Sequence, residues 1–374
     1  MGRVCLLLPS VSEGDALGHD VAGMFETFRA HGIETHVHAH RSPGRTRLPV
    51  DSMRRYARCA RQPDTVSIYH LTTTWRAGCD HFLSSVGPKV LRYHNVTPPR
   101  FFAPYSETLA RACALGFSET ARIVKSGRVD LYLAASAYNR DELVQLGAPA
   151  ERCGSLPPFN AIPKLDETPA AIPVLERYLD GSSNILFVGR VVPNKGHRHL
   201  LGVLAALRRT VVRPLRLILV GDLQPTCAAY YQELVALARR LAVDDAVVWT
   251  GKVASDELKA YWLLAHAFLV MSEHEGFCVP IVEAMAFGVP VIAHRAAAVA
   301  ETAGDAGIVL DGLDPILYAA AVETILTRPE VHDALAARGR ARVRQAFDPP
   351  RLAERLVEQV VPLLAQPART QHTG

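Results

Sequence analysis

The sequence lacks the cysteine spacing of a disulfide framework or a zinc site. It has seven cysteines among 374 residues, and no two of them follow a C-x-x-C pattern. An even number of cysteines at regular spacing would indicate a disulfide-bonded scaffold, and C-x-x-C pairs would indicate structural zinc. We therefore expect free thiols in a reducing compartment.

Long apolar runs and strong charge are also missing. No uninterrupted apolar stretch reaches the ~18 residues of a membrane-spanning helix, and the N-terminal run VCLLL is too short for a signal peptide. The net charge of +4 is too small to indicate nucleic-acid binding. These absences favour a cytoplasmic protein without a nucleic-acid partner, which contacts a membrane at most at its inner surface.

Short apolar runs alternate with helix-like segments along the whole chain. The runs that predict buried strands are RVCLLLPS, IETHVHAH, TVSIYHLT, KVLRYHNV and VDLYLAAS, followed by NILFVGRV, LRLILVGD, AVVWTGKV, AHAFLVMS, VPVIAH and AGIVL. This alternation predicts a doubly wound α/β fold.

The pattern predicts two domains facing a central cleft. We expect one domain at residues 1–160, a proline-rich linker at 161–178 and a second domain at 179–348. Residues 349–374 predict a helix, expected to pack on the N-terminal domain, and a polar tail. Ligands of open α/β sheets bind beyond the carboxyl ends of the strands, so both domains should present loops to the cleft.

The stretch SEHEGFCVPIVEAMAFGVPVIA places two carboxylates around the predicted start of a helix. Glu275 precedes Pro280, which suits a first helical turn, and Glu283 follows within the helix. Backbone N–H groups at a helix N-terminus bind anions, whereas carboxylates accept hydrogen bonds from hydroxyls. A nucleotide sugar has both phosphate and hydroxyl groups, so it would satisfy both features.

The stretch LFVGRVVPNKG adds two cations at the carboxyl end of a predicted strand. Arg190 and Lys195 lie in the loop after this strand, where together they would neutralise a diphosphate. Surface cations are usually only solvated, so the loop alone is weak support for a phosphate site. The two glutamates downstream strengthen the interpretation.

Together these motifs resemble the retaining family-4 glycosyltransferases of the GT-B fold, which has two Rossmann-like domains. The similarity rests on LFVGRVVPNKG, LILVGD, WTGKV and EHEGFCVPIVEAMAFGVPVIA, in which Glu275 and Glu283 match the family's E-x7-E motif. The first glycine loop, RYHN and AASAYNRDELVQLG extend the similarity to the N-terminal part. YHNVTPPRFF and SEHEGFCVP resemble bacterial members that build surface polysaccharides, several of which are mannosyltransferases.

The resemblance implies the catalytic residues. Arg190 and Lys195 would bind the donor diphosphate and stabilise the leaving charge, and Glu275 would bond hydroxyls of the transferred sugar. His94, at the end of the strand VLRYH, matches the histidine that faces the donor sugar. A single histidine is more often structural, but its position at a strand end favours a hydrogen bond to a sugar hydroxyl.

The resemblance also implies the remaining donor-binding residues. Glu283 would hold the ribose hydroxyls, and the others are Gly18, Val253, Gly276, Phe277 and Cys278. Many relatives have glycine in place of Cys278, whose side chain either narrows the sugar pocket or is a small buried residue; we favour the second interpretation. Relatives often carry paired glycines in the first loop, where this chain has Gly14 and Gly18.

The implied activity is a metal-independent transfer of a hexose. No D-x-D motif occurs, so we expect no metal and no other cofactor. The expected partners are a nucleotide sugar, foremost GDP-mannose, and a saccharide or polyprenyl-linked acceptor. The resemblance implies that the domain at 1–160 binds the acceptor and that the domain at 179–348 binds the nucleotide sugar. A UDP-sugar donor is the alternative within this class, and an inactive nucleotide-sugar-binding or scaffold protein is the alternative outside it.

Two further features have competing interpretations. The alternate histidines of HVHAH could suggest a metal, but the outer pair would lie about 13 Å apart along a strand, too far for one ion. The segment RSPGRTRLPVDSMRRYARCAR has seven arginines and one aspartate, and we expect Arg54, Arg58 and Arg61 to share a helical face. This face, with Arg55, is either merely solvated or a patch for anionic lipid or a polyprenyl-diphosphate acceptor.

Overall fold

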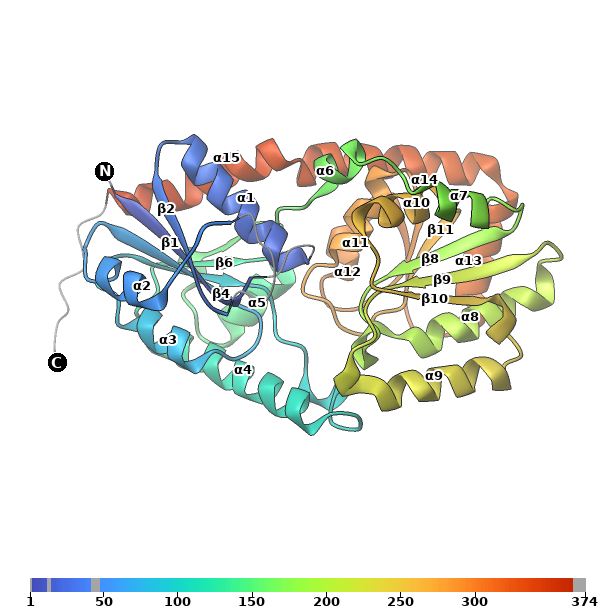
Figure 1. The fold of residues 1–374 in the computed structure, drawn as a ribbon, viewed down its shortest axis with the longest axis horizontal. Coiled ribbons are helices and arrows are strands. Elements are labelled where there is room, and N and C mark those ends of the chain that lie inside the picture. Colours follow the sequence, from blue (N-terminus) through green and yellow to red (C-terminus); the bar gives the residue numbers. More distant parts are fainter. Residues whose placement is uncertain (1, 12–14, 42–47, 366–374) are drawn as a thin grey trace. The chain divides into compact units, whose positions relative to one another are not determined.

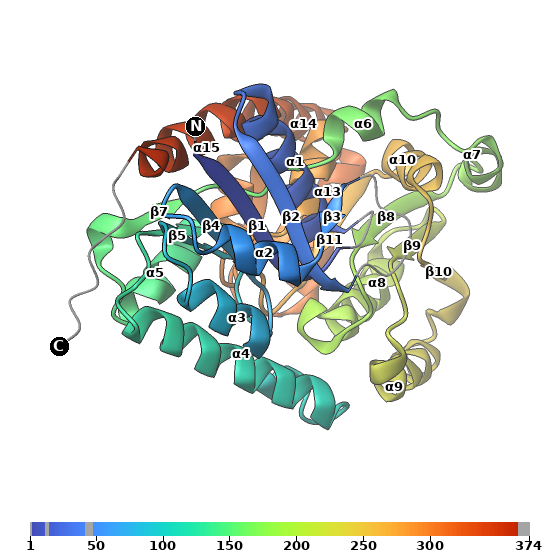
Figure 2. The same ribbon diagram turned by 60° about the vertical axis from the view of Figure 1, so that its left-hand side comes forward.

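Two units, each built on a parallel β-sheet, make up the structure (Figure 1). This computed structural model describes residues 2–11, 15–41 and 48–365. Unit 1 consists of residues 1–96, 111–160 and 347–374, and unit 2 of residues 97–110 and 161–346. Helices cover both faces of each sheet (Figure 2), which confirms the predicted doubly wound α/β class.

Unit 1 has a sheet in the order β3-β2-β1-β4-β5-β6-β7. The strands are β1 (Arg3–Ser10), β2 (Glu34–Arg41), β3 (Val50–Asp51), β4 (Thr65–Leu71), β5 (Lys89–Tyr93), β6 (Leu131–Ala134) and β7 (Cys153–Ser155). Its helices are α1 (Ala16–Ala30), α2 (Met53–Cys59), α3 (Arg76–Leu83), most of α4 (Glu107–Lys125), α5 (Ala137–Gln145) and α15 (Pro349–Leu364).

One face of this sheet is covered by α1 and α15. Val21, Met24 and Phe28 follow one another at helical spacing on α1 and are fully buried against β1. Leu352 and Leu356 of α15 join the same core, so the C-terminal helix belongs to unit 1. Each such side chain contributes about 1.5–3 kcal/mol by leaving water, and this burial holds α1 and α15 on the sheet.

Unit 2 has a sheet in the order β10-β9-β8-β11-β12-β13. The strands are β8 (Ser183–Val188), β9 (Leu215–Val220), β10 (Val247–Gly251), β11 (Ala267–Val270), β12 (Val291–His294) and β13 (Gly307–Leu310). Its principal helices are α8 (His197–Thr210), α9 (Ala228–Arg240), α10 (Ser255–Leu264), α11 (Val279–Ala286), α12 (Val299–Ala303), α13 (Pro315–Thr327) and α14 (Pro329–Arg342).

The segment predicted as an irregular linker contains two helices, α6 (Ile162–Glu167) and α7 (Ile172–Tyr178). Each has a proline in its first turn, where a missing N–H is tolerated, so prolines that indicated a break in fact begin helices. Leu165 and Tyr178 are buried in the core of unit 2, so this segment is part of that unit.

Residues 97–110, which we placed in the N-terminal domain, also group with unit 2. Tyr105 donates a hydrogen bond to Glu233 at 2.8 Å and accepts one from Arg198 at 2.9 Å. Its ring lies 5.1 Å from that of Tyr230. A chain segment that leaves β5 of unit 1 and returns along α4 therefore has its polar and aromatic contacts in unit 2.

Among the helices of the described ranges, none combines the length and the hydropathy that crossing a bilayer requires.

Candidate active site

The loops that follow β8 and β11 meet at one edge of the unit 2 sheet. These two strands pair in parallel, so their carboxyl ends are adjacent. Asn194 of the first loop donates its side-chain N–H to the carbonyl of His274, at 3.1 Å, and accepts a bond from the backbone N–H of Glu273, at 2.9 Å. This pairing brings the loop of Lys195 against the loop of Glu275.

Gly196 allows the close approach of the first loop. Its φ is +68°, and a Cβ at this position would lie 1.9 Å from the carbonyl oxygen of Met271. A side chain there would force the loop away from the end of β11. With glycine, the Nζ of Lys195 lies 2.6 and 2.8 Å from the two carboxylate oxygens of Glu275.

This Lys195–Glu275 ion pair is mostly shielded from water. The two side chains are 18% and 9% exposed. A carboxylate with so little hydration needs a cation beside it, because an unpaired buried charge is costly. The structure therefore brings together two residues that the sequence placed 80 positions apart.

Helix α11 begins four positions after Glu275, and the residue before the helix is strained. Cys278 is the residue before the helix, and its φ of +76° is in the left-handed region, which costs a non-glycine residue about 1–2 kcal/mol. The cysteine is buried, and burial, together with the nearby Glu275 carboxylate, raises the pKa of its thiol well above the usual value. Cys278 is thus a neutral thiol at the entrance of the helix.

Glu283 lies on the second turn of α11. Its carboxyl group is enclosed by protein while its side chain keeps partial exposure, and burial raises its pKa to about 7. A carboxyl group whose pKa is raised toward neutral pH, on the helix that follows Glu275, is typical of a binding or catalytic site.

The other predicted donor-binding residues of unit 2 lie in the loops after β8, β10 and β11, at the carboxyl ends of these strands. Arg190 is exposed and comes two residues after β8, and Val253 comes two residues after β10 with its side chain against the unit 2 core. Gly276 is partly exposed and Phe277 is buried. Their contacts with a donor stay predictions.

We expected Gly18 of unit 1 to lie in a loop, but it does not. It is in the first turn of α1, and its N–H donates to the carboxylate of Asp15 at 2.7 Å, as in a helix N-cap. Its backbone donor is therefore occupied by the protein. Gly14, the other glycine of this predicted loop, lies outside the described residues.

His94 lies directly after β5, as predicted, and has partners that sequence reasoning missed. Its Nε2 is 3.1 Å from the Nδ1 of His70 and 3.6 Å from a carboxylate oxygen of Asp20. Arg92 in turn binds both oxygens of Asp20. The only sequence signal was that Arg92 and His94 are two positions apart in the predicted strand VLRYH, which is the spacing of one strand face.

The arginines predicted for acceptor or membrane contact lie on α2 and just after it. Arg54, Arg55, Arg58 and Arg61 are all exposed, and Arg55 pairs with Asp51 at 2.9 Å. Because α2 ends at Cys59, the helical face expected for these residues does not extend to Arg61. Arg45 and Arg47, from the same predicted segment, lie outside the described residues.

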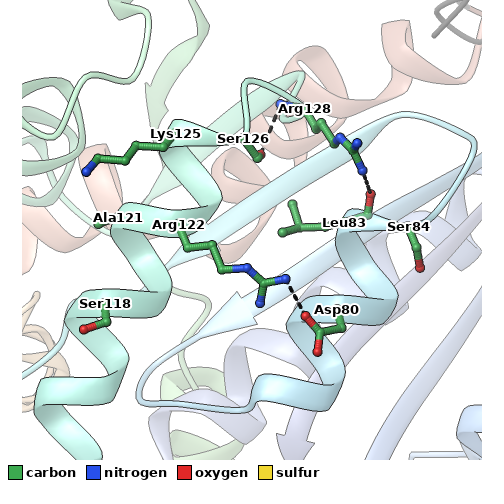
Figure 3. Close-up of a pocket in the computed structure, with 9 residues that line it drawn as sticks. All are labelled: Asp80, Leu83, Ser84, Ser118, Ala121, Arg122, Lys125, Ser126 and Arg128. Carbon is green, nitrogen blue, oxygen red and sulfur yellow. Dashed lines mark hydrogen bonds and ion pairs between the residues drawn. The ribbon is translucent and has the colours of Figure 1, made fainter. Parts of the chain in front are cut away.

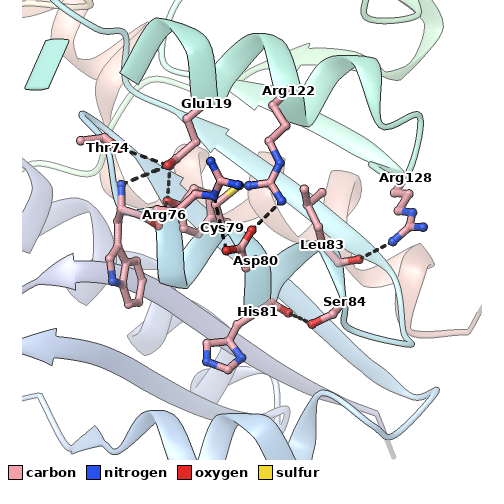
Figure 4. A network of polar contacts seen from close by, with 12 residues as sticks. Thr74, Arg76, Cys79, Asp80, His81, Leu83, Ser84, Glu119, Arg122 and Arg128 are labelled. Atoms are coloured by element: carbon pink, nitrogen blue, oxygen red, sulfur yellow. Dashed lines mark hydrogen bonds and ion pairs between the residues drawn. The ribbon is translucent and has the colours of Figure 1, made fainter. Parts of the chain in front are cut away.

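A basic groove lies between α3 and the end of α4 in unit 1 (Figure 3). Arg122 pairs with Asp80 across it, and Lys125 and Arg128 lie further along its edge. Beside the groove, the buried carboxylate of Glu119 accepts hydrogen bonds from Thr74 and from the backbone N–H of Trp75 (Figure 4). These contacts fix the loop after β4, and none of the residues predicted for transfer lines the groove.

Solved structures show which fold this architecture has. The Anabaena protein HepE (Alr3699), solved in complex with UDP-glucose, superposes with a TM-score of 0.78 at 17% identity. The comparison covers 97% of this chain and 100% of HepE. Two parallel sheets with flanking helices, matched over this length, define the GT-B fold of glycosyltransferases.

The sequence itself is similar to known glycosyltransferases over part of its length. Residues 178–342 match the model of the glycosyl transferases group 1. It is 32% identical over 240 residues to the GDP-mannose-dependent alpha-(1-6)-phosphatidylinositol monomannoside mannosyltransferase of Mycobacterium tuberculosis, covering 61% of each chain. It is 29% identical over 218 residues to O-antigen chain mannosyltransferase B of Escherichia coli, covering 58% of this chain and 56% of that one. The matched parts thus span about three fifths of these relatives.

Proposed function

We propose that the protein is a retaining hexosyltransferase that transfers mannose from GDP-mannose. The acceptor is a saccharide or a lipid-linked saccharide in the biosynthesis of a polysaccharide or glycoconjugate. The observation that carries the proposal is the Lys195–Glu275 ion pair at the start of α11, with Glu283 on the same helix. The named activities of the mycobacterial and Escherichia coli relatives support mannose as the transferred sugar.

Donor binding would break the Lys195–Glu275 ion pair. Lys195 and Arg190 then pair with the diphosphate, and the carboxylate of Glu275 accepts hydrogen bonds from the hydroxyls of the sugar. Fixed cations then stabilise the charge that develops on the leaving diphosphate. His94 donates a hydrogen bond to the sugar, and the carboxylate of Glu283 accepts bonds from the ribose hydroxyls.

Retention of configuration requires the acceptor to attack from the face that the diphosphate leaves. Glu275 is engaged by Lys195 rather than poised as a free nucleophile. In the proposed step the acceptor oxygen bonds to the anomeric carbon while the bond to the diphosphate breaks. The acceptor proton passes to the departing phosphate oxygen, which acts as the base.

A panel of nucleotides tests the donor by thermal shift. A ligand at 100 times its Kd stabilises the folded state by about 2.7 kcal/mol. We expect GDP and GDP-mannose to raise the Tm more than UDP and UDP-glucose do. The reverse order would assign a UDP-sugar donor, for which the UDP-glucose complex of HepE is the present support. Binding without turnover on any acceptor would instead favour a scaffold protein.

We propose that transfer needs no metal, because Lys195 and Arg190 supply the positive charge. Turnover should therefore persist, within about twofold, after treatment with EDTA. The assay is product formation before and after chelation, with added Mn²⁺ as the comparison. Complete loss that Mn²⁺ restores would contradict the fixed-cation account.

The exposed arginines of α2, together with Arg61 just after it, are proposed to hold the protein at an anionic membrane that carries the acceptor. Each basic residue near such a surface contributes on the order of 1 kcal/mol, so binding should be weak and salt-dependent. Changing Arg54, Arg58 and Arg61 to Ser should abolish sedimentation with phosphatidylglycerol vesicles at low salt. It should leave turnover on a short soluble acceptor unchanged.

The control for this experiment removes the same number of charges elsewhere. Arg209, Arg239 and Arg240 are exposed arginines of unit 2, near the ends of α8 and α9. Their replacement by Ser should leave sedimentation intact. Equal loss in both variants would mean that net charge, rather than the α2 surface, governs binding, and no sedimentation of the unmodified protein would leave α2 as a solvated face.

A further inference from the structure

The side chain of His94 is held from the inside of unit 1 by a second histidine. His70 is the last residue but one of β4, beside Arg92 on β5, and its side chain is completely buried. Its Nδ1 lies 3.1 Å from the Nε2 of His94, and the two rings stack at 5.3 Å between centroids. One of these two nitrogens must donate a proton to the other. The contact therefore fixes both the ring orientation and the tautomer of His94.

Asp20 cannot take this place as the hydrogen-bond partner. Its two oxygens accept bonds from Nε and Nη2 of Arg92, at 2.9 and 3.0 Å, and from the backbone N–H of Phe159 at 2.9 Å. The Oδ2 of Asp20 lies 3.9 Å from the Nδ1 of His70 and 3.6 Å from the Nε2 of His94, and both distances are beyond hydrogen-bond range. Asp20 and Arg92 thus form a buried ion pair, and the hydrogen bond of each histidine in this cluster is made to the other histidine.

Both imidazoles are neutral at pH 7. Burial lowers the pKa of His70 to about 4 and lowers the pKa of His94 well below its usual value. The Asp20 carboxylate opposes this shift, and the facing Arg92 adds to it. Burial alone would raise the pKa of Asp20, but the attraction of Arg92 outweighs it and the pKa falls to about 2. The cluster therefore contains one ion pair and two neutral rings, so a single proton lies between the rings.

The backbone after His94 is fixed from the other side. Asn95 has a φ of +79°, in the left-handed region, and its side chain donates to Asn139 at 2.8 Å and to Glu142 at 3.1 Å. Tyr93 donates to the same Glu142 carboxylate at 2.7 Å. A strained turn that is fixed by several buried bonds is characteristic of a functional site.

The position of the shared proton follows from the far nitrogen of His70. Among the described residues, Nε2 of His70 is buried without a hydrogen-bond partner. Buried N–H groups without a partner are rarer than unsatisfied acceptors, so a bare Nε2 is the less costly state. The proton of His70 then resides on Nδ1 and points at His94.

We propose that His70 is a positioning residue that donates from Nδ1 to Nε2 of His94 and so presents the Nδ1–H of His94 as a hydrogen-bond donor to the transferred sugar. This inference rests on the proposed function in one respect, namely that His94 contacts the donor. The pairing of the two histidines and the tautomer it sets depend on unit 1 alone.

A metal ion is the competing occupant of this cluster. One carboxylate oxygen and two ring nitrogens lie within 4.8 Å of one another. However, the guanidinium of Arg92 already binds both oxygens of Asp20, and a divalent cation would add two uncompensated charges to a buried site. The hydrogen-bonded pair is therefore favoured, and metal content is one outcome of the test.

Histidine ¹⁵N spectroscopy tests the tautomer without any activity. In the unmodified protein His94 should show a protonated Nδ1 and a bare Nε2, with its signal assigned by its loss in His94→Asn. In His70→Leu this single state should give way to a mixture of tautomers, whereas His70→Asn, whose amide N–H can replace Nδ1–H, should retain it. A protonated Nε2 on His94 in the unmodified protein overturns the inference.

Turnover tests the positioning role. His70→Leu should lower kcat about tenfold, the effect of one lost hydrogen bond, with nucleotide affinity and KM for the donor within twofold. His70→Asn should recover most of the rate. In a His94→Ala background the His70→Leu change should have little further effect, because the two residues act together. An undiminished further loss in that background would show a purely structural role and overturn the proposal.

Two other outcomes are also decisive. One equivalent of zinc in the purified protein, lost in His70→Leu, would replace the hydrogen bond by metal ligation and overturn the inference. If His94→Ala is fully active, the proposed role of His94 in transfer fails, while the spectrum still decides whether His70 sets its tautomer.

Discussion

Replacing Lys195 with alanine should lower turnover by at least ~10²-fold, the usual effect of losing a preorganised charge at a reacting centre. The same loss is expected for Arg190→Ala, because both cations are proposed to bind the leaving diphosphate. The measurement is kcat with saturating donor. Arg209→Ala, which removes an exposed arginine of the same unit, is the control and should be fully active.

The two variants separate catalysis from stability. Lys195→Ala leaves the carboxylate of Glu275 with little water and no cation, so the variant should also melt earlier. A Lys195→Ala/Glu275→Gln double variant should recover the Tm but not the rate. Arg190 is exposed, so its removal should affect turnover without affecting the Tm. Near-normal turnover in both single variants would refute the diphosphate assignment.

Replacing Glu283 with glutamine should stabilise the free protein and weaken nucleotide binding. The folded pKa of about 7 lies above the usual 4.5, so folding favours the neutral carboxyl group. Its contribution to stability is complete below pH 4.5 and is lost as the pH rises through 7. At pH 8 the glutamine variant should therefore gain up to about 3 kcal/mol, and at pH 4.5 almost nothing.

Donor affinity should show the opposite pH trend. The ribose hydroxyls need an ionised acceptor, and at pH 6 only about a tenth of Glu283 is ionised in the free protein. GDP-mannose should then bind the unmodified protein about tenfold more weakly at pH 6 than at pH 8. For Glu283→Gln the donor affinity at pH 8 should be lower by about ten- to a hundredfold, because bonds to a charged acceptor contribute about 1.5–3 kcal/mol. The affinity of this variant should not change with pH, because glutamine does not titrate.

Calorimetry at both pH values and melting curves between pH 4.5 and 8 measure these effects. Glu330→Gln, at an exposed position in unit 2, is the matched control and should change neither property. Donor affinity that is flat with pH in the unmodified protein would contradict the assignment of Glu283 to the ribose. We expect the gain in stability of Glu283→Gln over the unmodified protein to be larger at pH 8 than at pH 4.5. An equal gain at both pH values would contradict the raised pKa of Glu283.

The unit 2 site could be predicted because its signals are local. Glu275, Pro280 and Glu283 lie within nine positions, and helix chemistry alone places them around a helix start. The doubly wound pattern then placed the loop of Lys195 at the same edge of the sheet. What the sequence could not provide was the direct ion pair, which depends on Gly196 allowing the loop to reach the end of β11.

The unit 1 cluster was missed because its contacts depend on register and helix docking. His70 lies beside Arg92 only through the pairing of β4 with β5, and Asp20 reaches Arg92 from α1, 72 positions away. Nothing local in the sequence links these residues. The helices at 162–178 were missed for another reason, since a proline can begin a helix as well as end one.

Unit 1 begins the chain but cannot be completed until its last helix, α15, has been synthesised. Helix α15 is near the end of the sequence, yet Leu352, Leu356 and Val360 complete the core around β1 and α1 at its beginning. Domains usually fold as they emerge from the ribosome, N-terminal part first. Here the residues of unit 2 have all been made before the first unit receives its last helix. The growing chain must therefore carry an open apolar face on α1 for most of its synthesis, and nascent unit 1 should depend on chaperones more than unit 2 does.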